Sequence, residues 1–405
     1  MQGFDSPHDW GFWNLKRAFR ILDSKNPDVL LNIGDVCDHA SPKSLRCYMN
    51  IFKESFKKRP VHIACAGNHD FWTDKPDPEK DWRSFCDELE LPYDNPLCRT
   101  VGGYDFIAFS SSDGKNYPPE SLEKLEKAIR RAAERDSKKP IFVITHESPS
   151  ETVIGTIHDK AHTQLKEILS RWPQVISFGG HWHYPLEDER GIWQGAFTAI
   201  GTSTLSYGCR GMDGKFQNDV GGILPFAREV TQMLYLELFE DRLEVHRYHA
   251  DGREIKPDAL WSIPLPFRPE SAPYTFENRR KNRTAPEFAP GTDVLLRFDF
   301  GYLFLIFDQA HHPDFVHSYK IRVSRQDGTL VGEYTYISDF YRLPEHRDKR
   351  MFCRLPDKTL KGGEVYRFEI YPVESFGHTG KPLVANIRIN DNYQSQSTPF
   401  FYPQE

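Results

Sequence analysis

Six polar residues each follow a short apolar run of the kind that forms a buried strand. They are Asp35, Asn68, His69, His146, His181 and His183. In an open α/β sheet the carboxyl ends of the strands meet at one edge, which is where such folds bind their ligands. Carboxylate, amide and imidazole groups gathered there suit divalent Mn, Fe or Zn. The pattern therefore predicts a metal site built from strand ends.

The chain around these residues alternates between strand-like and helix-like stretches. Residues 11–24 place apolar side chains at helical spacing, and the apolar run 28–33 follows. A helix over 42–57 and a strand over 61–66 come next, an order that predicts a parallel βαβ unit. Further strands are expected at 104–110, 140–145, 173–178 and 196–202, a hairpin at 233–248, and helices at 82–89, 118–136 and 160–171.

The predicted ligands are numerous enough for two metal ions. Two ions about 3.5–4 Å apart can clamp a phosphoryl group and lower the pKa of a water between them. Asp35 is the candidate for a bridging carboxylate, and Asn68 offers a neutral carbonyl oxygen. His146 and His181 would complete one metal site. His183, two residues after His181, could reach the other metal.

His69 lies beside a predicted ligand but is free to point toward a substrate. An imidazole in that position could protonate a leaving alkoxide as a general acid. Asp38 is the expected carboxylate partner, which would hold the tautomer of His69 and raise its pKa.

Four motifs together resemble the calcineurin-like metallophosphoesterase family. Residues 34–38 are GDVCD, residues 67–70 are GNHD, residues 180–183 are GHWH, and His146 stands alone between the last two. They match the family's GDxxD, GNH(D/E), lone H and GHxH motifs in order, within roughly residues 10–250. The resemblance implies a four-layer α/β/β/α fold with a dinuclear metal centre.

The resemblance also implies a reaction. A metal-bound hydroxide would hydrolyse a phosphomonoester or phosphodiester, with His69 as general acid and Asp38 orienting it. The substrate would be a small-molecule phosphoester, and the cofactors two divalent metal ions (Mn, Fe or Zn). The ligands implied for these ions are those named above: Asp35, Asn68, His146, His181 and His183. Independently of the resemblance, Trp72, Trp182, Trp193 and Tyr207 could form an aromatic pocket, which would favour a substrate with an apolar or ring portion.

The family's first motif, an apolar strand ending in D-x-H, is not matched. Asp5 and His8 have the spacing D-x-x-H, and only residues 1–4 precede them. Asp5 lies about as far before Asp35 as the family's Asp does, so Asp5 and His8 are candidate ligands of the second metal. Alternatively, the first strand and its D-x-H lie upstream of Met1 and are missing here. The protein would then be a non-catalytic scaffold or an impaired phosphoesterase.

The composition changes in the last third of the chain. Residues 263–273 are rich in Pro and residues 278–283 are basic, which predicts a linker over 266–290. The first domain is expected to cover 1–265 and the second 291–405. The second contains β-type runs separated by turn residues, which predicts an all-β sandwich of immunoglobulin or fibronectin-III type.

Charge and composition limit the partners. The net charge of −6 predicts neither a nucleic acid nor an anionic membrane as partner. No apolar run reaches the roughly 18–20 residues of a membrane span. The odd count of seven Cys argues against a disulfide framework. The N-terminus has no signal-peptide pattern, so we expect a cytoplasmic protein unless an upstream start adds one; the oligomeric state stays open.

Overall fold

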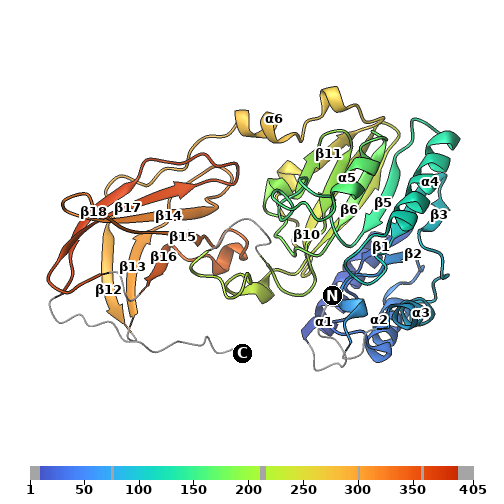
Figure 1. Ribbon diagram of the computed structural model, residues 1–405, viewed down its shortest axis with the longest axis horizontal. Coiled ribbons are helices and arrows are strands. Elements are labelled where there is room, and N and C mark those ends of the chain that lie inside the picture. The colour runs from blue at the N-terminus through green and yellow to red at the C-terminus, as the bar shows by residue number, and fades with distance from the viewer. Residues whose placement is uncertain (1–9, 74–76, 210–215, 300–301, 357–359, 391–405) are drawn as a thin grey trace. The chain divides into compact units, whose positions relative to one another are not determined.

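The computed structural model describes residues 10–73, 77–209, 216–299, 302–356 and 360–390 (Figure 1). The chain divides into two compact units. The N-terminal unit comprises Met1–Gly214 and Phe226–Arg279, and the C-terminal unit comprises Lys215–Pro225 and Arg280–Glu405. The division at Arg279 falls inside the expected linker, whereas the grouping of 215–225 with the C-terminal unit was not predicted. The domain bounds expected from the sequence stay a prediction.

The N-terminal unit begins with a helix and the expected βαβ unit. These elements are α1 (Trp10–Ser24), β1 (Val29–Ile33), α2 (Pro42–Ser55) and β2 (Val61–Cys65). The Ser41 side chain caps α2 by accepting a hydrogen bond from Ser44 N, and Pro42 takes the first helical position. Strands β1 and β2 pair in parallel. The apolar faces of α1 and α2 pack on them in one hydrophobic core.

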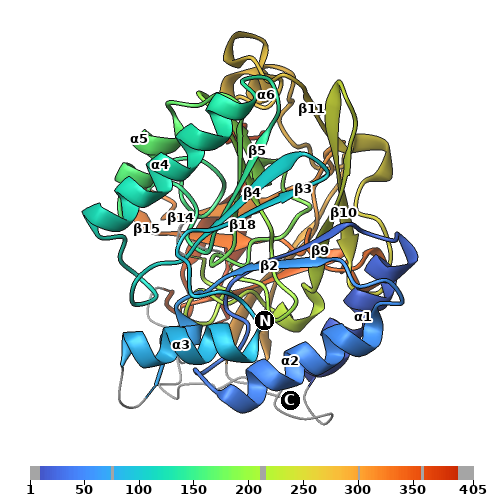
Figure 2. The same ribbon diagram turned by 90° about the vertical axis from the view of Figure 1, so that its right-hand side faces the viewer.

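A central sheet has the strand order β3-β4-β5-β6-β8-β7. Its strands are β3 (Leu97–Val101), β4 (Tyr104–Phe109), β5 (Ile141–Thr145), β6 (Val175–Gly179), β7 (Ile192–Gln194) and β8 (Thr198–Gly201). The four inner strands are parallel, and β3 and β7 pair antiparallel at the edges. All residues of β5 and β6 are buried, as expected for central parallel strands. Helices α4 (Pro119–Arg135) and α5 (Thr163–Leu169) cover one face (Figure 2).

The other face of the central sheet is covered by a second layer of strands. This layer contains β1 and β2 together with an antiparallel sheet of order β11-β10-β9, whose strands are β9 (Gln232–Leu238), β10 (Arg242–His249) and β11 (Trp261–Pro264). Residues of β2 and of β10–β11 pack on the central sheet. Residues of β1, β2, β9 and β10 also contact α1 and α2 on the other side. The layers therefore run helix, sheet, sheet, helix, which confirms the predicted four-layer α/β/β/α fold.

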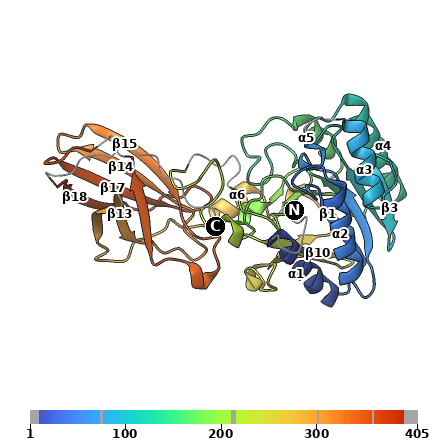
Figure 3. The ribbon, with the colours of Figure 1, turned by 90° about the horizontal axis from the view of Figure 1, so that it is seen from below.

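The C-terminal unit is built from antiparallel strands. One sheet contains β12 (Val294–Asp299), β13 (Tyr302–Asp308) and β16 (Arg350–Leu355), and the other β14 (Ser318–Arg325), β15 (Leu330–Ile337), β17 (Val365–Val373) and β18 (Leu383–Arg388). The two sheets share one core, which includes Leu305, Tyr319 and Phe368. Figure 3 shows β14, β15, β17 and β18 side by side, with β13 apart from them. The sheets are consistent with the predicted β-sandwich.

Short helices complete the described structure. They are α3 (Pro78–Glu88), α6 (Phe276–Lys281), and the 3₁₀ helices η1 (His69–Phe71), η2 (Glu189–Gly191), η3 (Ala227–Glu229), η4 (Pro257–Ala259), η5 (Pro269–Ser271) and η6 (Pro344–His346). Among the described residues, no helix has both the length and the apolar character needed to cross a bilayer.

Candidate metal centre

The predicted ligands follow four strands of the N-terminal unit. Asp35 comes two residues after β1, and Asn68 comes three residues after β2. His146 directly follows β5, and His181 comes two residues after β6. Because β1 pairs in parallel with β2, and β5 with β6, the side chains within each pair emerge at one end of their strands.

These four side chains converge. His146 Nε2 lies 3.2 Å from Asp35 Oδ2 and 3.1 Å from Asn68 Oδ1. His181 Nδ1 lies 3.0 Å from the same Asn68 oxygen and 3.3 Å from His146 Nε2. The ligand atoms of Asp35, His146 and His181 all lie within 4.8 Å of one another. The structure therefore brings four of the predicted ligands into one cluster.

The donor set fits a divalent cation. His146 Nδ1 donates a hydrogen bond to Ile33 O at 2.7 Å, so the neutral ring turns its Nε2 lone pair toward Asp35 and Asn68. Histidine ligands are commonly fixed in this way by a hydrogen bond on the other ring nitrogen. A carboxylate, an amide oxygen and two imidazole nitrogens that face each other supply lone pairs of the kind that transition metals bind.

Two glycines allow the loops after β1 and β2 to approach each other. A Cβ on Gly67 would lie 2.2 Å from Asp35 Oδ1. A Cβ on Gly34 would lie 2.7 Å from Gly67 N and from His146 Nδ1, and Gly34 has a φ of +82°. Gly34 and Gly67 are therefore both required by the close contact between the two loops.

Three predicted ligands have a backbone in the left-handed region. The φ angles are 49° at Asp35, 65° at His181 and 49° at His183. Residues other than Gly rarely adopt this conformation, and each instance costs on the order of 1–3 kcal/mol. Such residues gather at functional sites, where the surrounding structure holds them in place.

Asp35 and His146 are each 3% exposed, so their charges depend on one another. Burial raises the pKa of the Asp35 carboxyl, but the adjacent His146 outweighs this and holds that pKa well below its usual range. Burial lowers the pKa of His146, whereas the Asp35 carboxylate raises it, with a net value of about 9. Without a metal the two side chains form an ion pair, and a divalent ion would replace the proton.

The predicted ligands of the second ion are described only in part. His183 Nδ1 donates a hydrogen bond to Tyr207 O at 2.9 Å, which leaves Nε2 as its ligand atom. Burial lowers the pKa of His183 to about 3, so the ring is neutral. His183 is not in the cluster of Asp35, His146 and His181, although it lines the same cavity. Asp5 and His8 lie outside the described residues.

His69 is held beside the cluster. Its backbone N–H donates a hydrogen bond to Asp35 Oδ1 at 2.9 Å. Its Nδ1 lies 2.7 Å from the carbonyl oxygen of Asp38 and 3.3 Å from the Asp38 carboxylate. Burial lowers the pKa of His69, but its bonds to Asp38 and the charge of Asp35 outweigh this and raise it. The expected pairing with Asp38 is present, and the backbone carbonyl is the nearer partner.

Glu147 is a residue of this site that the sequence analysis did not select. It is 7% exposed, and its carboxylate oxygens lie 3.3 Å from His181 Nδ1 and 3.6 Å from His162 Nε2. Burial raises the pKa of Glu147, but the hydrogen bond from His162 and the nearby His181 outweigh this and lower it. The available signal was its position directly after His146, at the end of a buried strand.

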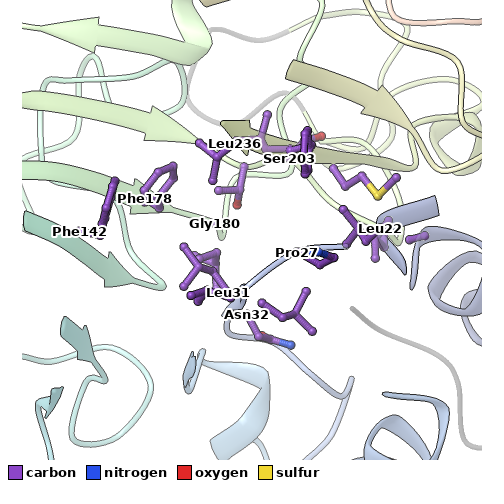
Figure 4. A pocket seen from close by; sticks show the side chains of 18 of the residues that line it. Leu22, Pro27, Leu31, Asn32, Phe142, Phe178, Gly180, Ser203 and Leu236 are labelled. Carbon is purple, nitrogen blue, oxygen red and sulfur yellow. The ribbon is translucent and has the colours of Figure 1, made fainter. Parts of the chain in front are cut away.

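A cavity of about 610 Å³ extends from the predicted metal ligands between β1 and β9 (Figure 4). Leu31 of β1 and Leu236 of β9 project into it from opposite sides, and Phe142 and Phe178 of the central sheet form one wall. Among the described strands, β1 pairs only with β2, and β9 only with β10. The second strand layer is therefore interrupted at this cavity.

Residues 7–185 match the model of the calcineurin-like phosphoesterase family. This range contains every residue of the four motifs, together with Glu147. The resemblance drawn from the motifs is confirmed over this part of the chain.

The solved structures that the chain resembles include a purple acid phosphatase from yellow lupin (Lupinus luteus) seeds and a putative 5′-nucleotidase from Staphylococcus aureus. The first is 13% identical with a TM-score of 0.40, and the match covers 62% of this chain and 49% of that chain. The second is 11% identical with a TM-score of 0.32, covering 76% and 68%. The chain thus spans about half the length of the lupin phosphatase. A search of curated proteins finds no match.

Proposed function

We propose that the N-terminal unit hydrolyses small-molecule phosphomonoesters or phosphodiesters with the help of two divalent metal ions. The observation that supports this most directly is the convergence of Asp35, Asn68, His146 and His181, all within the stretch that matches the phosphoesterase family. Divalent ions bound there would activate a water and neutralise the phosphoryl oxygens.

Each ligand has a separate role in this proposal. Asp35 would help to hold both ions, because its two carboxylate oxygens face different partners: Oδ2 faces His146 and Oδ1 accepts from His69 N. Asn68, His146 and His181 hold one ion. The other ion relies on His183 and on the predicted ligands Asp5 and His8. The donor types accept Mn, Fe or Zn.

His69 is the proposed general acid. Its Nδ1 faces Asp38, so Nε2 is the atom available to a substrate. The contacts with Asp38 and Asp35 raise the pKa of His69 and so favour the protonated ring, and a protonated imidazole can donate its proton to the leaving oxygen. Asp38 is a positioning residue that fixes the ring orientation.

The test combines metal analysis of the purified protein with turnover of bis-p-nitrophenyl phosphate and p-nitrophenyl phosphate. His69→Ala should lower kcat roughly 10²–10⁴-fold without changing the metal content. His158→Ala is the matched control, because His158 is exposed and belongs to the same unit. Less than one metal per chain, together with no loss of activity in His69→Ala, would contradict the proposal.

The alternative, a scaffold or an impaired phosphoesterase, is favoured by the cavity between β1 and β9. We infer that this cavity accommodates one more strand, because a polypeptide strand could pair with both open edges. Hydrogen exchange can test this on the amides of β1 and β9 that do not bond to β2 or β10. Slow exchange supports a strand in the cavity, whereas exchange at the rate of an open edge contradicts it. An open cavity combined with one metal per chain and no turnover would support the scaffold.

A further inference from the structure

Trp72 is a large aromatic side chain left 53% exposed beside the proposed general acid. Its ring centroid lies 4.8 Å from that of His69, with the planes tilted by 57°. The His39 ring meets it edge-on, at 5.1 Å and 83°. The preceding residue, Phe71, is buried in the core of α1 and α2. The chain therefore anchors one aromatic side chain inside and presents the next at the surface of the site.

The backbone of Trp72 is fixed from two directions. Its N–H donates a hydrogen bond to His69 O at 3.2 Å, which closes η1. Its carbonyl accepts a hydrogen bond from Ala40 N at 3.0 Å. Ala40 belongs to the loop after β1 that also carries Asp35 and Asp38. The position of the indole is therefore set by the same two loops that set His69.

Exposure alone does not distinguish this side chain, since single exposed apolar residues are common. Trp13 of α1 is 47% exposed, but it packs against Phe12 and under the Lys16 ammonium. Trp72 differs because its neighbour is the residue whose proposed task is to touch the leaving oxygen. A ring attached close to that oxygen would lie within the 4.5–7 Å range in which aromatic rings attract each other.

We propose that Trp72 stacks on a planar aromatic ring of the leaving group, so that the site prefers aryl and nucleoside-like phosphoesters to alkyl ones. This inference rests on the proposed phosphoesterase function and adds a substrate class to it. Trp182 and Tyr207 pack instead on His181 and His183, and Trp193 packs on Phe197 near α4 and α5. Of the four aromatic residues expected to form a pocket, Trp72 is thus the one in contact with His69.

Two stable substrate analogues test the proposal on the metal-loaded full chain. Phenylphosphonate carries a ring and methylphosphonate does not, and calorimetry gives the Kd of each. Trp72→Ala should weaken phenylphosphonate binding about tenfold and leave methylphosphonate binding unchanged. Trp72→Phe should retain most of the preference, because it keeps a ring. Trp13→Ala is the matched control and should change neither Kd.

The outcomes distinguish a failure of the stacking proposal from a failure of the proposed phosphoesterase function. If the unsubstituted protein binds both phosphonates and Trp72→Ala changes neither or both equally, the stacking role is wrong while the phosphoesterase function stands. If the unsubstituted protein binds neither phosphonate, the phosphoesterase function fails and this inference fails with it.

Discussion

Among the described residues of the N-terminal unit, two groups of carboxylate and imidazole side chains are close enough together to hold a metal ion. We call them the strand-end cluster (Asp35, His146 and His181) and the sheet-face cluster (Glu237, Glu244 and His246). In both clusters the ligand atoms lie within 4.8 Å of one another. Proximity is therefore the same in the two clusters, and what differs is how each cluster is built.

The sheet-face cluster follows from ordinary strand pairing. Glu244 of β10 lies directly opposite Glu237 of β9, and His246 is two residues further on the same face. His246 Nδ1 lies 2.7 Å from Glu254 and its Nε2 lies 3.1 Å from Glu237. Arg242 Nε lies 2.6 Å from Glu244. Other side chains of the protein thus already contact these ligand atoms.

The strand-end cluster is built differently. Two of its members have left-handed backbones, two glycines are needed to bring the loops together, and a backbone carbonyl orients His146. The left-handed backbones cost free energy, and a bound ion would offset that cost. The comparison teaches that close donors indicate a metal site where backbone conformation, close loop contact and an oriented ring bring them together, and not where strand pairing alone places them on one face.

The largest effect is expected from Asp35→Asn, which keeps the shape of the side chain and removes the charge shared by both proposed ions. We expect loss of bound metal and a fall in kcat larger than the roughly 10–100-fold caused by losing a partner that contacts only a ligand. Metal content by mass spectrometry and turnover of bis-p-nitrophenyl phosphate measure the two effects. Glu237→Gln is the matched control from the other cluster. Retention of both metal and activity in Asp35→Asn would remove the proposed distinction between the clusters.

Glu147→Gln should have the next largest effect. The carboxylate contacts His181 and His162, so its removal should loosen a ligand and weaken metal affinity or activity roughly 10–100-fold. Titration of the metal-free protein with Mn²⁺ measures the affinity. Glu151→Gln is the control, because Glu151 lies in the same segment but its side chain is half-exposed and paired with Lys166. Equal affinities for the two variants would mean that Glu147 has no positioning role.

The difference between Glu147 and Asp35 also shows how far the sequence could be interpreted. Asp35 could be selected because an apolar run followed by Gly-Asp marks a strand end. Glu147 also follows a strand end, but its contact with His162 was not predictable, because His162 is 15 residues away and reaches it only in the folded chain. The contact between His69 and the Asp38 carbonyl was not predicted either, because the pattern of side chains does not indicate which backbone carbonyl will accept a hydrogen bond.

The strands likewise divide into those that the sequence predicted and those that it did not. Strands β1, β2, β5 and β6 were predicted because continuous apolar runs of this length have few alternatives. Strands β3, β7, β11 and β16 were not predicted. β7 has three residues, and β3 carries Cys98, Arg99 and Thr100 exposed along its middle. Such strands form because a neighbouring strand offers an edge, which is tertiary information that local propensity lacks.

Metal binding to the strand-end cluster should depend on pH. The pKa of His146, raised to about 9 by Asp35, means that the ring carries a proton at pH 7 in the metal-free protein. An ion must displace that proton, so affinity should rise up to about tenfold per pH unit from pH 6 and level off near pH 9. Calorimetry of Mn²⁺ binding in two buffers of different ionisation enthalpy should show about one proton released per ion at pH 7. Affinity that is flat over this range would mean that the Asp35–His146 ion pair does not precede the metal.

The smallest effect is expected from the double substitution Glu237→Gln, Glu244→Gln in the sheet-face cluster. It removes the repulsion between two carboxylates directly opposite each other and also the pairings with His246 and Arg242. Because these side chains are partly exposed, the two contributions are small and opposed, and the free energy of unfolding should change by less than about 1 kcal/mol. Metal content and kcat should not change. A variant that loses one ion per chain would show that the sheet-face cluster binds metal, and that ordinary strand pairing is enough to build such a site.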